Sequence, residues 1–188
     1  MSQIPDEAAQ FAFTFCPPGF ASCIAGGAVL DFERAKDIDL WVLAGDRMPE
    51  EVAALTHDHI DLMGYKYEMW QPYPQRHMFK VADVPFTESK PVQVMVYPAH
   101  RADQLLELFD ISVHMHALLP DGRLMNVGKS TKPGETIRVV RFDTPYSTLR
   151  RYFAFCQRYS AQIVWNDVEE LCEEIARRRA SRKKEAAL

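Results

Sequence analysis

The sequence predicts an α+β fold in which a mixed β-sheet is flanked by helices and further helices follow toward the C-terminus. Three observations support this prediction. Short apolar runs typical of strands alternate with helix-like segments up to about residue 143. Residues 110–118 alternate between polar and apolar side chains, as a half-buried strand does. After Pro145 only helical patterns occur. We therefore expect a core at 1–143 and a C-terminal helical part at 144–188.

The first predicted elements lead into a tight turn. A short helix is expected at 5–15, because two prolines and a glycine follow Cys16 and stop regular structure. Residues 20–25 are small and apolar and predict a buried strand. This strand runs into Gly26-Gly27, after which 28–32 predict about one helical turn.

The next two elements have the clearest patterns. Residues 37–43 predict a strand, because they are rich in large apolar side chains and end before Gly45-Asp46. Residues 49–63 predict a helix, with Pro49 at its start and Gly64 at its end. The remaining expected elements are strands at 65–70, 77–81 and 92–97, a helix at 102–109, strands at 110–118 and 123–127, and helices at 146–159 and 167–184.

Composition excludes several classes of protein. The chain has 188 residues, 47% of them hydrophobic, which suits one globular domain with a helical appendage. A net charge of -4 argues against a nucleic-acid binder that is basic throughout. No apolar run reaches the length of a membrane span. The four cysteines form no C-x-x-C pair, so we expect free thiols and a cytoplasmic protein.

Residues 24–43 combine two features that favour phosphate chemistry. Gly26 and Gly27 lie where a strand turns into a helix, so a phosphate can approach the backbone and the free N–H groups of the helix start. Asp37 and Asp39 follow two apart on a strand, which places both carboxylates on one face. Because two close carboxylates repel each other, we expect a divalent cation between them.

This arrangement resembles a known family. Gly26-Gly27 followed by Asp37-Ile38-Asp39-Leu40 is similar to the signature of the DNA polymerase β-like nucleotidyltransferase superfamily, especially its minimal and phage-borne members and the catalytic head of tRNA nucleotidyltransferases. Residues 92–96, 105–113 and 148–159 are similar to parts of small phage proteins of this kind, so the resemblance covers about 20–160.

The resemblance implies a nucleotidyltransferase fold and a metal-dependent transfer of a nucleoside monophosphate from an NTP to a hydroxyl acceptor. Mg²⁺ (or Mn²⁺) would be the cofactor. The alternative is the same fold without activity, acting as a module that binds nucleotide or a nucleic-acid or protein partner. The acceptor, the base preference and the oligomeric state are not readable from the sequence.

A third carboxylate is implied by the resemblance, and two positions compete for it. Asp110 is the preferred catalytic and metal-binding residue, because alternation at 110–118 would place it on one face with His114 and His116. Gln93 lies where some relatives carry an acid, and would be a departure from the family pattern. The two histidines are interpreted as lining a polar sheet face rather than as a metal pair.

Four cations are candidates for holding the triphosphate. Arg34 and Lys36 precede Asp37, while Arg151 and Arg158 lie seven apart on a predicted helix and so share one stripe. Each has an alternative interpretation as a solvent-exposed charge. The basic end of the last helix could contact RNA, although a solvated helix is the simpler interpretation.

Overall fold

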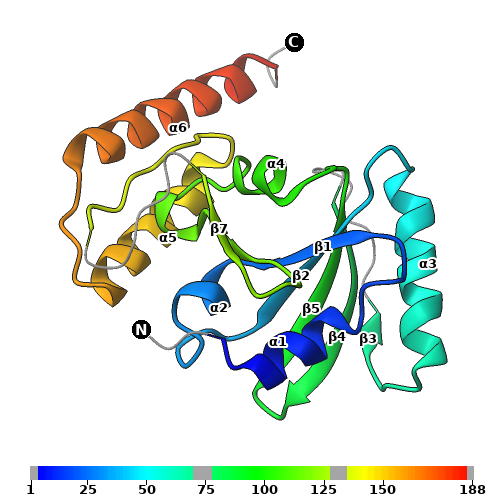
Figure 1. The fold of residues 1–188 in the computed structure, drawn as a ribbon. Coiled ribbons are helices and arrows are strands. Elements are labelled where there is room, and N and C mark those ends of the chain that lie inside the picture. Colours follow the sequence, from blue (N-terminus) through cyan, green and yellow to red (C-terminus); the bar gives the residue numbers. More distant parts are fainter. Residues whose placement is uncertain (1–3, 70–77, 128–134, 186–188) are drawn as a thin grey trace. The chain divides into compact units, whose positions relative to one another are not determined.

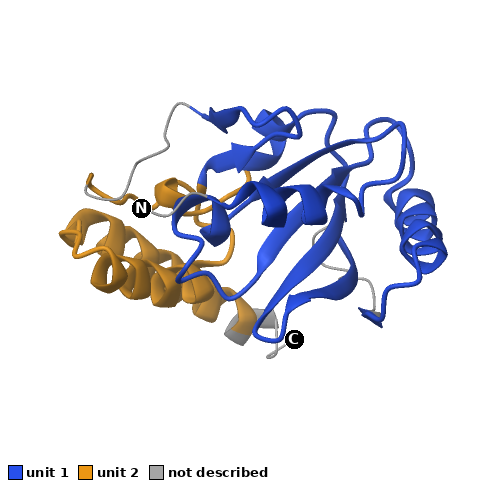
Figure 2. Ribbon diagram, turned by 60° about the horizontal axis from the view of Figure 1, so that its bottom comes forward, with its two compact units in different colours: residues 1–107, 115–128 blue, residues 108–114, 129–188 orange. Residues whose placement is uncertain are grey.

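A computed structural model describes residues 4–69, 78–127 and 135–185, which form two compact units. Unit 1 comprises 1–107 and 115–128, and unit 2 comprises 108–114 and 129–188 (Figure 2). The boundary expected from the sequence, between 143 and 144, stays a prediction about domains.

Unit 1 contains a mixed β-sheet whose described strands follow the order β3-β4-β5-β2-β1-β6-β7 (Figure 1). β2 and β5 pair in parallel, and every other pair is antiparallel. The strands are β1 (Ala21–Ala25), β2 (Ile38–Leu43), β3 (Glu68–Met69), β4 (Phe79–Thr87), β5 (Lys90–Tyr97), β6 (His116–Leu118) and β7 (Leu124–Asn126). The predicted α+β fold class is confirmed.

Alternation along the central strands separates a core face from a polar face. On β2, Ile38, Leu40 and Val42 are fully buried, whereas Asp39 and Trp41 between them keep some exposure. The helices α1 (Asp6–Phe13) and α3 (Pro49–Leu62) contribute buried residues to the same core as these side chains, and two shorter helices complete unit 1, α2 (Gly27–Leu30) and α4 (Ala102–Leu106). The face with Asp39 is therefore the one available for chemistry.

Most of the strands and helices expected in unit 1 are present, with shifted ends. The strand predicted at 77–81 is β4, which continues to Thr87, because Ala82 and Val84 still alternate inward after Val81. The strand predicted at 65–70 is reduced to β3. Residues 70 and 77 of these two predictions lie outside the described residues.

The prediction of one continuous strand at 110–118 is wrong. Ile111 forms an isolated bridge to Val139, Ser112–His114 form a 3₁₀ turn, and only His116–Leu118 form a strand. Backbone hydrogen bonds explain the difference, since the Ser112 N–H donates to the Arg138 carbonyl rather than to a sheet neighbour. His114 and His116 therefore do not share a strand face, and they belong to different units.

Unit 2 is built around α5 (Pro145–Arg158) and α6 (Trp165–Glu185). Tyr152 is fully buried, and its hydroxyl donates to the Ile137 carbonyl and accepts the Val164 N–H. Asp167, also buried, accepts hydrogen bonds from the Arg138 guanidinium and the Val139 N–H at 2.7–3.0 Å. Buried polar groups with such partners fix the segment before α5 to both helices.

Two further expectations can be compared with the described residues. Within residues 4–69, 78–127 and 135–185, none of the helices is both long and apolar enough to pass through a bilayer. All four cysteines are free thiols, two of them buried, as the sequence predicts.

Candidate functional site

Gly26 forms a bend between β1 and α2 that places its backbone against a carboxylate. Its φ and ψ of 101° and -154° belong to a region that only glycine adopts readily. A Cβ at this position would lie 2.7 Å from the Asp39 Oδ2. Gly27 differs, because a Cβ there would meet nothing within 4 Å. The first glycine therefore permits a close approach of the backbone to Asp39, and the second does not limit the packing.

Asp37 is close enough to Asp39 to influence its ionisation. Burial raises the pKa of Asp39 to about 8, and the negative charge of Asp37 adds to this effect. Burial is also the main cause of a raised pKa at Asp37. The structure thus places Asp39 against the Gly26 bend and within electrostatic reach of Asp37. It also gives both acids surroundings that penalise negative charge unless a cation is present.

Asp39 lies in a row of polar side chains that crosses the sheet. Its register partner on β5 is Gln93, and the partner of Gln93 on β4 is Asp83. Directly paired residues on neighbouring strands face the same side of a sheet, so these three side chains share the polar face. Glu68 of β3 pairs with Asp83 and extends the row to a fourth strand. The position beside Asp39 is therefore a neutral amide, and the next acid lies one strand further away.

Lys80 places a positive charge on this face. Its Nζ donates to the Asp83 Oδ2 at 3.1 Å. The positive charge of Lys80 lowers the pKa of both Asp37 and Asp39, while the negative charge of Asp83 raises both. All four charged groups therefore act on one region of unit 1.

Sequence reasoning missed Lys80 and Asp83 for a specific reason. Residues three apart on a regular strand face opposite sides. A register shift between Lys80 and Ala82 marks a β-bulge, and this bulge brings Lys80 onto the same face as Asp83. The alternation of Ala82, Asp83 and Val84 could have indicated that Asp83 faces the polar side of the sheet, but the predicted strand ended at Val81.

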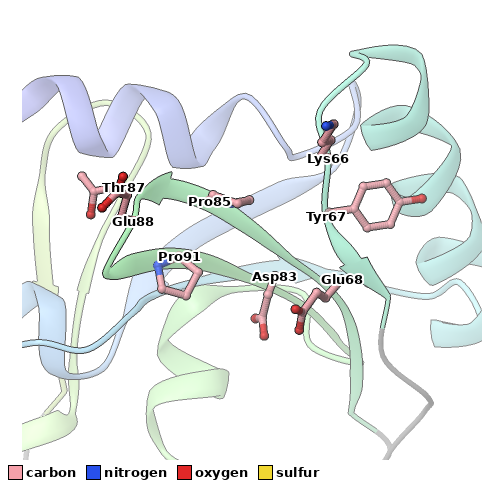
Figure 3. Close-up of a pocket in the computed structure, with 8 residues that line it drawn as sticks. All are labelled: Lys66, Tyr67, Glu68, Asp83, Pro85, Thr87, Glu88 and Pro91. Carbon is pink, nitrogen blue, oxygen red and sulfur yellow. The ribbon is translucent and has the colours of Figure 1, made fainter.

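A pocket of about 350 Å³ borders the row at the β3–β4 edge. Figure 3 shows Glu68 and Asp83 side by side with both carboxylates pointing the same way, as their pairing requires. The other residues that line it are Lys66, Tyr67, Pro85, Thr87, Glu88 and Pro91. The pocket therefore shares Asp83 with the acidic face.

The predicted phosphate-binding cations are divided between the two units. In unit 1, Arg34 pairs with Asp31 at 3.6 Å, and Lys36 is exposed and lowers the pKa of Asp37. In unit 2, the Arg158 guanidinium lies 5.6 Å from the centre of the Phe155 ring. Arg151 of the same helix makes an ion pair with Asp110.

Asp110 occupies a polar cluster within unit 2. Its carboxylate accepts hydrogen bonds from the Thr148 hydroxyl and the Arg151 guanidinium. Asp110 precedes the Ile111 bridge rather than starting a strand, so the alternation used to place it does not hold. Its role as a third metal ligand stays a prediction.

The donor set of the acidic face fits a hard divalent cation. Carboxylate oxygens are the ligands that Mg²⁺ and Mn²⁺ prefer, and the pKa of Asp39 is raised mainly because burial leaves its negative charge poorly solvated. Among the described residues, no group of three or more acidic, histidine or cysteine side chains converges as a complete metal cluster. The described residues thus bring two carboxylates together rather than forming a full cage.

No protein-family model matches the sequence, and a search of curated proteins finds no match. Solved structures do match. A tRNA-processing enzyme in an apo form aligns with a TM-score of 0.58 and 17% identity, covering 93% of this chain and 48% of the enzyme. A CCA-adding enzyme in complex with CTP aligns with a TM-score of 0.63 and 16% identity, covering 90% of this chain and 41% of the enzyme.

The fold is a nucleotidyltransferase fold. At these identities the likeness shows the fold alone. The chain spans less than half the length of either enzyme. In this nucleotidyltransferase fold, the polar sheet face with Asp37, Asp39 and Gly26 is the candidate functional site.

Proposed function

We propose that the protein is a metal-dependent nucleotidyltransferase that transfers a nucleoside monophosphate from an NTP to a hydroxyl acceptor. One observation supports this most strongly: Asp39 lies against a glycine bend on the polar face of a nucleotidyltransferase fold, and the negative charge of Asp37 acts on it. A neighbour of the same fold was solved with CTP, which favours an NTP as the substrate.

Asp37 and Asp39 would hold the divalent ion, Mg²⁺ or Mn²⁺. Such an ion neutralises triphosphate charge and stabilises the charge that develops on the departing pyrophosphate. Metal binding requires ionised ligands, so Asp39 would lose its proton in the loaded protein despite its raised pKa.

The other candidate residues would bind and orient the substrate. The Gly26–Gly27 backbone allows the triphosphate to approach, and Arg34 and Lys36 line the segment that leads to Asp37. Arg151 and Arg158 are proposed to contact the phosphates, with Asp110 assisting activation of the acceptor hydroxyl. In the reaction, the hydroxyl oxygen bonds to the α-phosphorus, pyrophosphate leaves, and the hydroxyl proton passes to a nearby base.

RNA remains one proposed acceptor, bound through the basic end of α6. Part of that basic run already has partners in unit 2. Arg178 donates to the carbonyls of Phe142 and Asp143, and the Arg179 guanidinium lies 5.5 Å from the centre of the Tyr146 ring. These contacts make a structural role for the basic run at least as well supported as an RNA contact.

Label transfer tests the proposed activity. The full chain is incubated with α-labelled ATP, CTP, GTP or UTP and Mg²⁺ or Mn²⁺, together with cellular RNA, cellular protein or hydroxylated small molecules. We expect one acceptor class to be labelled, and Asp37→Asn and Asp39→Asn to lower labelling by at least about a hundredfold. Asp46→Asn, in an exposed segment after β2, is the matched control and should keep wild-type labelling. Absence of Asp37-dependent label on every acceptor would refute the activity.

Gln93 favours a second candidate function, a nucleotide-binding module without turnover. This residue places a neutral amide beside Asp39, where a further carboxylate would assist the chemistry. Isothermal titration with Mg²⁺–NTP separates the two functions. Binding that depends on Asp37 and Asp39 without label transfer would establish the module, and label transfer would exclude it.

A further inference from the structure

We propose that Lys80 supplies a fixed positive charge to the acidic face and limits the nucleotide-free protein to one divalent cation. This inference rests on the proposed function, because it concerns the metal that Asp37 and Asp39 would hold. It assigns a positioning role to Lys80, whose ammonium acts on the aspartate pair through its charge.

Placement of Lys80 depends on the β-bulge in β4. Without the register shift between Lys80 and Ala82, the side chains of Lys80 and Asp83 would face opposite sides of the sheet. With it, the Lys80 Nζ lies 3.1 Å from the Asp83 Oδ2 on the face that carries Asp39. A local irregularity that re-aims one side chain is typical of β-bulges beside functional sites.

Lys80 and Asp83 are largely withdrawn from water. Their side chains expose only 14% and 15% of their surface. A surface pair of this length would contribute little, because water screens it. Here the charges are poorly screened, so the ammonium also acts on Asp37 and Asp39, whose ionisation it favours. Lys36 also favours ionisation of Asp37, but it is exposed.

Charge balance gives the number of cations. Among the described side chains of this face that are not exposed, there are three carboxylates, from Asp37, Asp39 and Asp83, and one ammonium, from Lys80. Glu68 and Lys36 are exposed, so water and salt screen their charges and they are left out of this balance. When all are ionised, two negative charges remain, and one divalent ion neutralises them. A second divalent ion would leave net positive charge in a region with little solvent. An acid at position 93 would change this balance, but Gln93 is neutral.

Mn²⁺ binding to the nucleotide-free full chain at pH 8 tests the inference. Electron paramagnetic resonance counts free ions, and the Asp39→Asn variant gives the background of non-specific binding. We expect one Asp39-dependent ion per wild-type chain. Removing a nearby positive charge should lower the dissociation constant for Mn²⁺ by about tenfold or more. The reason is that a poorly screened unit charge repels a divalent ion with a free energy that corresponds to at least this change in the dissociation constant.

A series of variants changes the charge in known steps. Lys80→Met and Gln93→Glu each add one negative charge to the balance, and both should bind the ion about tenfold more tightly. Asp83→Asn removes one and should bind it about tenfold more weakly. The double variant Lys80→Met/Asp83→Asn restores the wild-type balance, and its affinity should return to within about threefold. Arg47→Met, which removes an exposed cation after the opposite end of β2, should bind like wild type.

The outcomes distinguish this inference from the proposed function. Two Asp39-dependent ions in wild type, or equal affinity of Lys80→Met and wild type, would overturn the role of Lys80 while label transfer could still occur. No Asp39-dependent ion in any variant would overturn both the role of Lys80 and the assignment of the metal ligands. If Lys80→Met does not fold, the comparison of Lys80→Met/Asp83→Asn with Asp83→Asn decides the question, because these two variants differ only at Lys80 and neither leaves Asp83 as an unpaired acid.

Discussion

Replacement of Gly26 by alanine tests the central geometry of the site. The new Cβ would lie 2.7 Å from the Asp39 Oδ2, closer than real Cβ contacts come. The backbone at φ 101° and ψ -154° adds a conformational cost of about 1–3 kcal/mol for any residue other than glycine. Together, strain and displacement of Asp39 should lower the free energy of unfolding by about 3 kcal/mol.

Thermal and urea unfolding, followed by circular dichroism, measure this loss. For a chain of this size a loss of about 3 kcal/mol corresponds to a fall in Tm of roughly 6–12 °C. Gly27→Ala is the matched control. Nothing lies within 4 Å of its Cβ, and its φ is not positive, so stability should change by less than about 0.5 kcal/mol or rise slightly.

A double-mutant cycle separates the steric cost from backbone strain. In an Asp39→Ala background the contact is gone, so Gly26→Ala should cost only the backbone strain. The cost of Gly26→Ala should therefore be smaller there than in the wild-type background, and this difference, the coupling energy between the two sites, should be about 1 kcal/mol. Equal stability of Gly26→Ala and wild type would refute the reasoning. So would a Gly27→Ala variant that is as unstable as Gly26→Ala.

Three further predictions concern charge. Without metal, Asp39 stays protonated in the folded protein up to a pKa of about 8 but ionises near pH 4 when unfolded, so its stabilising contribution is present at low pH and lost as pH rises between these values. Asp39→Asn should therefore be more stable than wild type by about 2 kcal/mol in urea unfolding at pH 8, and similar to it at pH 4. Mg²⁺ or Mn²⁺ at a hundred times its dissociation constant should stabilise wild type by about 2.7 kcal/mol, seen as a rise in Tm that Asp39→Asn lacks. Asp167→Ala should destabilise unit 2 by about 2–3 kcal/mol, because it leaves the Val139 N–H without its acceptor and Arg138 without its ion pair, whereas the exposed Asp143→Ala should cost less than about 0.5 kcal/mol in the same assay.

Local patterns predicted most of unit 1. A run of large apolar side chains that ends before Gly45-Asp46 identified β2, and proline and glycine marked the ends of α3. The strand expected at 110–118 failed because its alternation was real but its backbone partners lie elsewhere, at Arg138 and Val139. A pattern of side chains does not reveal which distant segment takes the backbone hydrogen bonds.

The sequence by itself determined the glycine bend and the aspartate pair, because both depend on spacing over fewer than 20 residues and on the period of a single strand. Tertiary structure alone decided which charges surround them. Asp83 lies in the same row as Asp39 because β2 pairs with β5 and β5 pairs with β4. Lys80 lies on the same face only because of a β-bulge. Asp110 instead accepts a hydrogen bond from Arg151 of α5. Register and bulges result from packing between segments far apart in the chain, and no local period encodes them.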